Sequence, residues 1–132
     1  MRTLVVEDDF TSRKLLQRFL AFYGECDVAV NGTEAVEAFR ESLKRGDRYD
    51  LICLDIRLPE KNGHEVLEEI RRIEAERGIN GLDASKVIMT TAAGDAKSVC
   101  SAFRSQCDGY LVKPYDRSKM AVQLKELGLI KI

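Results

Sequence analysis

Five short apolar runs, each followed by a turn and then by a segment with helical periodicity, restrict the fold of this chain more than any other feature. The runs lie at residues 4–6, 26–30, 51–54, 87–89 and 110–112. They are continuous rather than alternating, which is typical of strands covered on both faces of a sheet. Five strand–helix repeats therefore predict a doubly wound α/β fold, with a parallel sheet, right-handed crossovers and helices on both faces.

The segments between the runs place apolar residues on one face of a helix. Their apolar positions are Leu15, Leu16, Phe19, Leu20 and Tyr23; Ala35, Phe39 and Leu43; Val66, Leu67, Ile70 and Ile73; Val99, Phe103 and Cys107; and Met120, Leu124 and Leu127. Thr11 and Ser12 provide a cap signal for the first helix, and Gly128 provides a stop signal for the last. The fourth helix has a weaker pattern, and the longest loop, Glu76–Lys86, precedes the fourth strand.

The size and composition of the chain indicate a single globular domain over residues 1–132. A length of 132 residues and an apolar content of 45% are enough for one core, and two prolines and nine glycines are too sparse to mark a linker. The formal net charge of −1 argues against a generic nucleic-acid or anionic-membrane binder. Because no apolar run approaches about 18 residues and no signal peptide opens the chain, we expect a soluble cytoplasmic protein.

The four cysteines do not form a recognisable metal site. Cys26, Cys53, Cys100 and Cys107 show no C-x-x-C spacing, and the chain has a single histidine. We therefore interpret them as free, mostly buried thiols in a reducing compartment.

Polar residues follow the apolar runs at the edge of the sheet where ligands bind in such folds. They are Glu7, Asp8 and Asp9 after the first run, Asp55 after the third, Thr90 and Thr91 after the fourth, and Lys113 after the fifth. Carboxylates crowded together repel one another, and a hard divalent cation such as Mg²⁺ relieves this repulsion. A lysine beside the same pocket neutralises an incoming phosphoryl oxygen. The pattern indicates an aspartate nucleophile with metal-assisted phosphoryl transfer.

Four of these segments resemble the response-regulator receiver domains of two-component signalling. They are Leu4–Asp9, Leu54–Pro59, Met89–Ala92 and Tyr110–Pro114, which occur in the order and at the spacing of that family. The similarity extends from about Arg2 to Leu127. It implies a flavodoxin-like (βα)5 fold, a five-stranded parallel sheet in the order 2-1-3-4-5.

The resemblance implies a phosphoacceptor and a magnesium site. Asp55 would accept the phosphoryl group. Glu7 and Asp8 would form the acidic pair, with Asp8 binding Mg²⁺ directly and Glu7 binding it through water. The backbone carbonyl of Arg57 would be a further metal ligand.

The resemblance also assigns roles to residues of the fourth and fifth strands. Thr91 would bond one phosphoryl oxygen and Lys113 would pair with another. Tyr110 would be the switch aromatic residue, and the Lys113–Pro114 peptide bond would be cis.

Each assignment has a simpler structural alternative. Asp55 is compatible with a turn or helix cap at the end of a strand, and Asp9 fits an N-cap outside the metal set. Thr91 is also an ordinary strand residue, and Tyr110 is compatible with a half-buried core position. His64 is a candidate phosphoryl carrier, but an exposed position in the first turn of a helix explains it better, since the donor histidine is expected on a separate kinase.

The sequence departs from the DNA-binding members of the family. The positions that form charged pairs in their dimers correspond to Gly109, Lys119 and Gln123, so we expect a monomer without direct DNA binding. Only Gly128–Ile132 follow the last predicted helix, so we expect a stand-alone receiver without an output domain, similar to the chemotaxis regulators or to a phosphorelay intermediate.

Two further positions bear on how long a phosphoryl group survives. In the family these positions influence attack by water, and here they hold Arg57 and Ala93. A long cationic side chain at position 57 stabilises the phosphorylated state and obstructs the water, while Ala93 has no polar group to orient it. We expect slow self-hydrolysis; the alternative is that Arg57 points to solvent and pairs with Glu60.

The predicted function is a phosphorylation switch, with a histidine kinase or a histidine phosphotransfer protein as phosphodonor and Mg²⁺ as cofactor. The predicted surface for a downstream protein is Gly94–Tyr115. One alternative is a phosphatase with an aspartate nucleophile, although such enzymes usually have an acid where this chain has Arg57. Another is a pseudo-receiver, a docking module that is never phosphorylated. A flavoprotein is disfavoured because no phosphate-binding glycine or hydroxyl loop follows the first strand.

Overall fold

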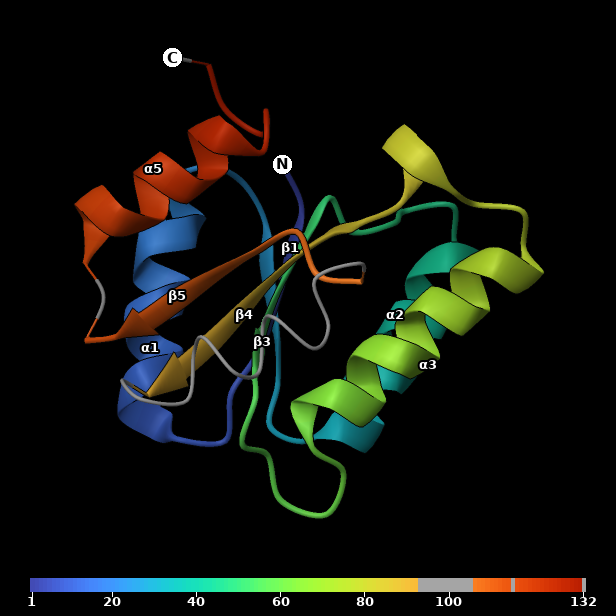
Figure 1. Ribbon diagram of the computed structural model, residues 1–132, viewed down its shortest axis with the longest axis horizontal. Helices are drawn as coiled ribbons and strands as arrows, with labels where there is room; N and C mark the ends of the chain where they lie inside the picture. Colours follow the sequence, from blue (N-terminus) through green and yellow to red (C-terminus); the bar gives the residue numbers. More distant parts are fainter. Residues whose placement is uncertain (93–105, 115, 132) are drawn as a thin grey trace.

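The computed structural model of the chain describes residues 1–92, 106–114 and 116–131. Five parallel strands form one sheet in the order β2-β1-β3-β4-β5, which confirms the predicted topology (Figure 1). The strands are β1 (Thr3–Val6), β2 (Cys26–Ala29), β3 (Leu51–Asp55), β4 (Lys86–Ala92) and β5 (Gly109–Lys113). The helices are α1 (Phe10–Ala21), α2 (Gly32–Lys44), α3 (Gly63–Glu76) and α5 (Arg117–Glu126), with a short 3₁₀ helix, η1 (Gly81–Asp83).

The sheet lies between two layers of helices, because successive strand residues point to opposite faces. Helices α2 and α3 cover one face, and α1 and α5 cover the other (Figure 1). The first core contains Leu4, Val6, Ile52, Leu54, Val87 and Met89 from the strands. The second contains Val5, Leu51, Cys53, Ile88 and Leu111. Covering both faces explains the continuous apolar runs of the sequence.

Side-chain caps set where the helices begin. Asp9, Asn31, Asn62 and Asp116 each accept a hydrogen bond from the backbone N–H three residues later. The predicted cap of the first helix at Thr11 and Ser12 is therefore wrong: Asp9 is the N-cap, because its carboxylate accepts from the N–H of Ser12 at 2.8 Å. The alternative given for Asp9 is thereby confirmed. At the other end of the chain, α5 stops before Gly128, which has a φ of 73°.

The connection between α3 and β4 spans residues 77–85 and contains η1, in agreement with the predicted long loop. The predicted fourth helix falls mostly on residues 93–105, outside the described residues; Cys107 is described and is half-buried just before β5. Cys53 is fully buried, and burial raises the pKa of its thiol. Cys26 is half-buried, and burial followed by the charge of Asp27 raises its pKa to about 11.

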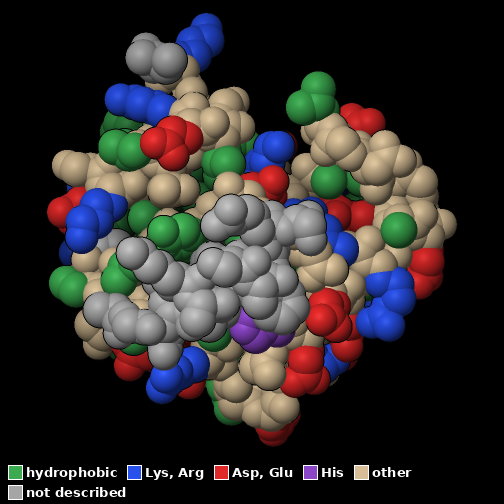
Figure 2. Space-filling view, in the orientation of Figure 1, with side chains coloured by type: hydrophobic (Ala, Val, Ile, Leu, Met, Phe, Trp, Pro, Cys, Tyr) green, Lys and Arg blue, Asp and Glu red, His purple; other side chains and the backbone are tan. Residues whose placement is uncertain are grey.

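The described surface carries charges of both signs. On the face shown in Figure 2, Lys and Arg side chains are interspersed with Asp and Glu side chains, as a formal net charge of −1 implies. Within the described ranges, none of the helices has the length and apolar character needed to cross a membrane.

Candidate functional site

The carboxyl ends of four strands bring the candidate site residues to one edge of the sheet. Glu7 and Asp8 directly follow β1, and Asp55 is the last residue of β3. Thr91 lies near the end of β4, and Lys113 is the last residue of β5, where it pairs in register with Ala92. Parallel pairing alone therefore collects residues that are far apart in the sequence.

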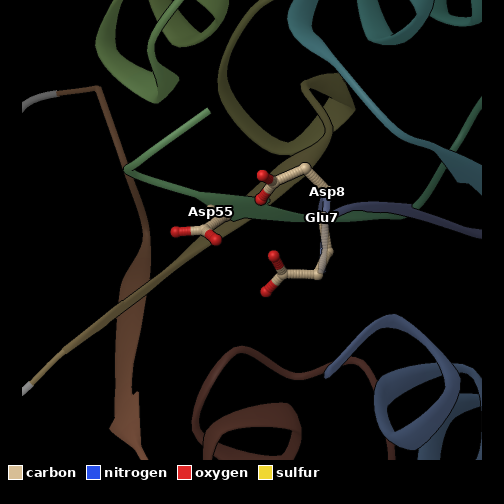
Figure 3. A group of neighbouring side chains, drawn as sticks. All are labelled: Glu7, Asp8 and Asp55. Carbon is tan, nitrogen blue, oxygen red and sulfur yellow. The ribbon is translucent and has the colours of Figure 1, made fainter. Parts of the chain in front are cut away.

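Three carboxyl groups form the centre of the site. One carboxylate oxygen from each of Glu7, Asp8 and Asp55 lies within 4.8 Å of the others (Figure 3). Glu7 is fully buried, Asp55 is 5% exposed and Asp8 is exposed. Two of the three carboxylates are thus held away from water, where their mutual repulsion is strong.

Lys113 supplies a positive charge to the two buried carboxylates. Its Nζ donates to Oε1 of Glu7 at 3.0 Å and to Oδ2 of Asp55 at 3.2 Å. Burial acts to lower the pKa of Lys113, but its hydrogen bond to Glu7 and the charges of both carboxylates outweigh this effect and raise the pKa. The lysine is therefore cationic at neutral pH.

One ammonium group does not fully compensate two buried carboxylates. Burial, followed by the hydrogen bond with Asp55, raises the pKa of Glu7 to about 7, although the hydrogen bond from Lys113 opposes both effects. Without another cation, the cluster therefore tends to hold a proton on Glu7 near neutral pH.

Backbone N–H groups fix the orientation of the two buried carboxylates. The N–H of Arg57 donates to Oδ1 of Asp55 at 3.0 Å, and the N–H of Asp9 donates to Oε2 of Glu7 at 3.1 Å. The turn after β3 is closed by the N–H of Gly63, which donates to the carbonyl of Ile56 at 2.9 Å. The Lys113–Pro114 bond is cis, as the resemblance implied.

The donor set fits Mg²⁺. Among the described residues, three carboxylates share the site with one lysine, and carboxylate oxygens are the ligands that this hard cation prefers. A divalent cation would compensate the charge that Lys113 leaves unbalanced. The predicted role of the Arg57 carbonyl as a ligand stays a prediction, as does water-mediated binding by Glu7.

The predicted switch residues lie on the neighbouring strands β4 and β5. Thr91 is buried, and the preceding residue, Thr90, pairs in register with Asp55. The hydroxyl of Thr91 donates to the carbonyl of Ala92 at 3.4 Å. Tyr110 is 41% exposed, so it is not the half-buried core residue that its alternative required. His64 lies in the first turn of α3, as predicted, but is half-buried rather than exposed, and burial lowers its pKa.

Arg13 is a feature of the site that the sequence analysis missed. From the first turn of α1, its Nη1 donates to the backbone carbonyl oxygens of Glu7 at 3.1 Å and of Asp8 at 3.3 Å. In the sequence it is one of several cations on an amphipathic helix. Only its position one turn after the acidic pair could have drawn attention to it.

Comparison with known proteins places this geometry in a family context. The sequence model of the response regulator receiver domain matches residues 3–125. The probable transcriptional regulator ycf29 of Porphyra purpurea is 34% identical over 125 residues, which cover 94% of this chain and 54% of that protein. The chemotaxis protein CheY of Thermotoga maritima is 29% identical over 129 residues, which cover 96% of this chain and 97% of that protein. The chain spans about half the length of several curated relatives.

Solved structures show the same architecture. The response regulator TrrA from Thermotoga maritima, in complex with Mg²⁺-BeF, is 34% identical with a TM-score of 0.75, and the match covers 96% of this chain and 97% of that one. The co-crystal structure of the Saccharomyces cerevisiae phosphotransfer protein Ypd1 with the receiver domain of Ssk1 matches at 27% identity and a TM-score of 0.79. This match covers 98% of this chain and 89% of that one.

Proposed function

Because the chain belongs to the response regulator receiver domain family, we propose that Asp55 accepts a phosphoryl group in a Mg²⁺-dependent reaction and that this switches a protein-interaction surface. Receiver domains are signalling modules of two-component phosphorelays. The observation that carries the proposal is the position of Asp55, whose two carboxylate oxygens accept from the N–H of Arg57 and from Nζ of Lys113 beside the acidic pair.

The proposed reaction transfers a phosphoryl group from a phosphohistidine or a small phosphodonor. A carboxylate oxygen of Asp55 attacks the phosphorus atom, so that an O–P bond forms while the bond to the leaving group breaks and its electron pair stays with that group. Lys113 stabilises the negative charge of the phosphoryl oxygens, and the N–H of Arg57 holds the carboxylate in place. Thr91 is the proposed hydroxyl donor to a second phosphoryl oxygen.

A magnesium ion would be held by Glu7, Asp8, Asp55 and the carbonyl of Arg57. When bound, it supplies positive charge that offsets the repulsion between the carboxylates and the incoming phosphoryl oxygens. The protein supplies the geometry, because Glu7 and Asp55 are already buried and oriented by hydrogen bonds.

Receiver domains pair with histidine kinases or phosphotransfer proteins, and we propose one of these as the phosphodonor. The co-crystal structure of Ypd1 with the Ssk1 receiver supports this choice. The match covers 97% of a CheY but about half of longer transcriptional regulators, so the domain occurs both as a short protein and within larger ones, and a stand-alone regulator stays a prediction. Monomeric state, lack of DNA binding and cytoplasmic location stay predictions.

For the output, we propose that phosphorylation draws Thr91 toward the phosphate and lets Tyr110 turn inward. The exposure of Tyr110 supports this, because the side chain has room to change rotamer. Of the predicted surface Gly94–Tyr115, residues 106–114 are described, whereas 94–105 and 115 lie outside the described residues. Beryllofluoride, a phosphoryl mimic, should shift amide NMR signals across this surface. Shifts confined to the neighbourhood of Asp55 would contradict the coupling.

The function is tested by incubation with acetyl phosphate and Mg²⁺, followed by intact mass measurement. We expect one phosphoryl adduct on the wild type and on Asp9→Asn, which retains the helix cap, but none on Asp55→Asn or in excess chelator. An adduct that persists in Asp55→Asn or forms equally in chelator contradicts the proposal. A folded wild type that takes no adduct would favour the pseudo-receiver, and turnover of a phosphomonoester would favour the phosphatase.

A further inference from the structure

The side chain of Arg13 contacts the backbone of Glu7 and Asp8 rather than their carboxylates. Its Nη1 donates to the carbonyl oxygens of Glu7 and Asp8, at 3.1 and 3.3 Å. These two carbonyls belong to the peptide groups on either side of the Cα of Asp8. A single guanidinium therefore fixes both peptide planes from which the Asp8 side chain projects.

Asp8 depends on its backbone more than the other two acids do. Glu7 and Asp55 are each held by Lys113 and by a backbone N–H group. Among residues 1–92, 106–114 and 116–131, no group donates a hydrogen bond to the carboxylate of Asp8, which is exposed. Like charges on Glu7 and Asp55 repel this carboxylate, so rotation toward solvent would relieve the crowding (Figure 3). The backbone conformation therefore decides whether Asp8 stays in the cluster.

The position of Arg13 is itself restricted. The end of its guanidinium lies 5.5 Å from the centroid of the Phe10 ring, a cation–π distance, and Phe10 is 64% exposed. Nζ of Lys14 lies 5.6 Å from the same ring, but Lys14 bonds neither carbonyl within the described part of the chain. Arg13 and Lys14 thus share a charge, a helix turn and an aromatic neighbour, and differ in the carbonyl contacts.

We propose that Arg13 is a positioning residue that holds Asp8 in the acidic cluster and thereby raises the affinity of the site for Mg²⁺. The inference rests on the proposed function of the site. It predicts that removal of Arg13 weakens Mg²⁺ binding. A simple charge effect would act in the opposite direction, because a cation near the cluster repels a divalent ion. If charge alone mattered, removal of Arg13 would strengthen Mg²⁺ binding.

The experiment is a calorimetric titration of MgCl₂ into the wild type, Arg13→Met and Lys14→Met, without phosphodonor. Residues behind the ligands of a metal site typically contribute about tenfold or more to affinity. We expect Arg13→Met to bind Mg²⁺ about tenfold more weakly than the wild type, and Lys14→Met to stay within about twofold, since a single screened surface charge has a small effect. Thermal unfolding in chelator checks that the variants fold; if Arg13→Met does not, Arg13→Gln, also neutral, carries the same expectation.

A readout without metal separates positioning from general destabilisation. The carbonyl ¹³C chemical shifts of Glu7 and Asp8 should change in Arg13→Met or Arg13→Gln and stay unchanged in Lys14→Met, because Arg13 donates to these carbonyls and, within the described residues, Lys14 does not. Equal or tighter Mg²⁺ binding by the Arg13 variant, relative to Lys14→Met, would overturn the inference and leave the function of Asp55 intact. A folded wild type that binds no Mg²⁺ would instead overturn the proposed function.

Discussion

Nζ of Lys113 lies 3.2 Å from Oδ2 of Asp55, although 58 positions separate the two residues in the chain. The contact spans the end of β4, which lies between β3 and β5 in the sheet. The same ammonium group also donates to Glu7, which directly follows β1, the neighbour of β3 on its other side. One lysine thus links the ends of strands that only the fold makes neighbours, and it forms an ion pair with the proposed phosphoacceptor.

Removal of this cation should slow phosphorylation. In Lys113→Met, the phosphoryl oxygens lose a preorganised positive charge, and we expect the rate of adduct formation from acetyl phosphate to fall about a hundredfold. Intact mass time courses measure the rate. Lys86→Met is the control, because Lys86 is similarly exposed but lies at the opposite end of the sheet, 4.0 Å from Asp108. Equal rates in the wild type and Lys113→Met would contradict the assigned role.

The metal-free protein should lose stability as Glu7 ionises. Burial raises the pKa of Glu7 from 4.5 to about 7 in the folded state. Between these values the folded state binds more protons than the unfolded state, so the free energy of unfolding contributed by Glu7 falls as pH rises from about 4.5 to about 7. Urea denaturation in chelator at pH 5 and pH 8 measures the difference. The side chain at position 7 in Glu7→Gln does not titrate, so this variant should lose the part of the pH dependence that Glu7 contributes. An unchanged difference between pH 5 and pH 8 in Glu7→Gln would show that Glu7 is not the source of the pH dependence.

Gly63 should be intolerant of a side chain. A Cβ at this position would overlap the carbonyl oxygen of Asp55 and lie 2.8 Å from the Cα of Ile56, so either α3 or the backbone of the phosphoacceptor would have to move. We expect Gly63→Ala to lower the free energy of unfolding by about 1–3 kcal/mol and to slow phosphorylation. In the control Gly109→Ala, the new Cβ meets the end of the flexible Gln123 side chain, which can move aside. Comparable losses in both variants, from chemical denaturation and adduct formation, would contradict this explanation.

A buried ion pair on α3 should contribute far more to stability than a more exposed pair of the same length. Glu74 is 2% exposed, and its Oε1 accepts from Nη1 of Arg71 at 2.7 Å. Arg71 also donates to the carbonyls of Ser85 and Gln106 and to the carboxylate of Asp108. Because Arg71→Met leaves a buried carboxylate without its cation, we expect a loss of about 3 kcal/mol in the free energy of unfolding.

The matched pair is Lys61 and Glu69, also 2.7 Å apart but 27% and 24% exposed. Lys61→Met should cost less than about 1 kcal/mol. The two variants are compared by urea denaturation. Similar losses would show that burial is not what distinguishes the two pairs.

The lifetime of the phosphoryl group should depend on positions 57 and 93. Arg57 is exposed at the site, and Ala93 lies outside the described residues. Arg57→Asn removes a cationic side chain that would stabilise the phosphorylated state by about one charge-assisted hydrogen bond, and Ala93→Glu adds a polar group that can orient the attacking water. We therefore expect each substitution to speed dephosphorylation about tenfold. Time courses of adduct loss test this. If neither variant loses phosphate faster than the wild type, these positions do not set the lifetime.

The fold was predictable because its determinants are local. Continuous apolar runs such as Leu51–Leu54 require cover on both faces, and Asn62 and Gly128 mark helix ends through short-range hydrogen bonds and backbone preference. The gathering of Glu7 and Asp55 followed from the same pattern, since all strands of a parallel sheet end at one edge. The mistaken cap at Thr11 and Ser12 arose because Asp9, two positions earlier, is an equally suitable capping residue, and the sequence does not show at which of them the helix begins.

Tertiary structure alone decided the contacts between side chains of different elements. The sequence placed Lys113 at the correct edge, but packing determined that its ammonium bonds both Glu7 and Asp55. In the sequence Arg13 is one of several cations on an amphipathic helix, and only the structure shows that it donates to two carbonyls. Burial, which raises the pKa of Glu7, likewise depends on atoms from several elements at once. Local sequence determines which elements form and which edge holds the polar residues, whereas distances, orientations and proton affinities depend on how those elements pack.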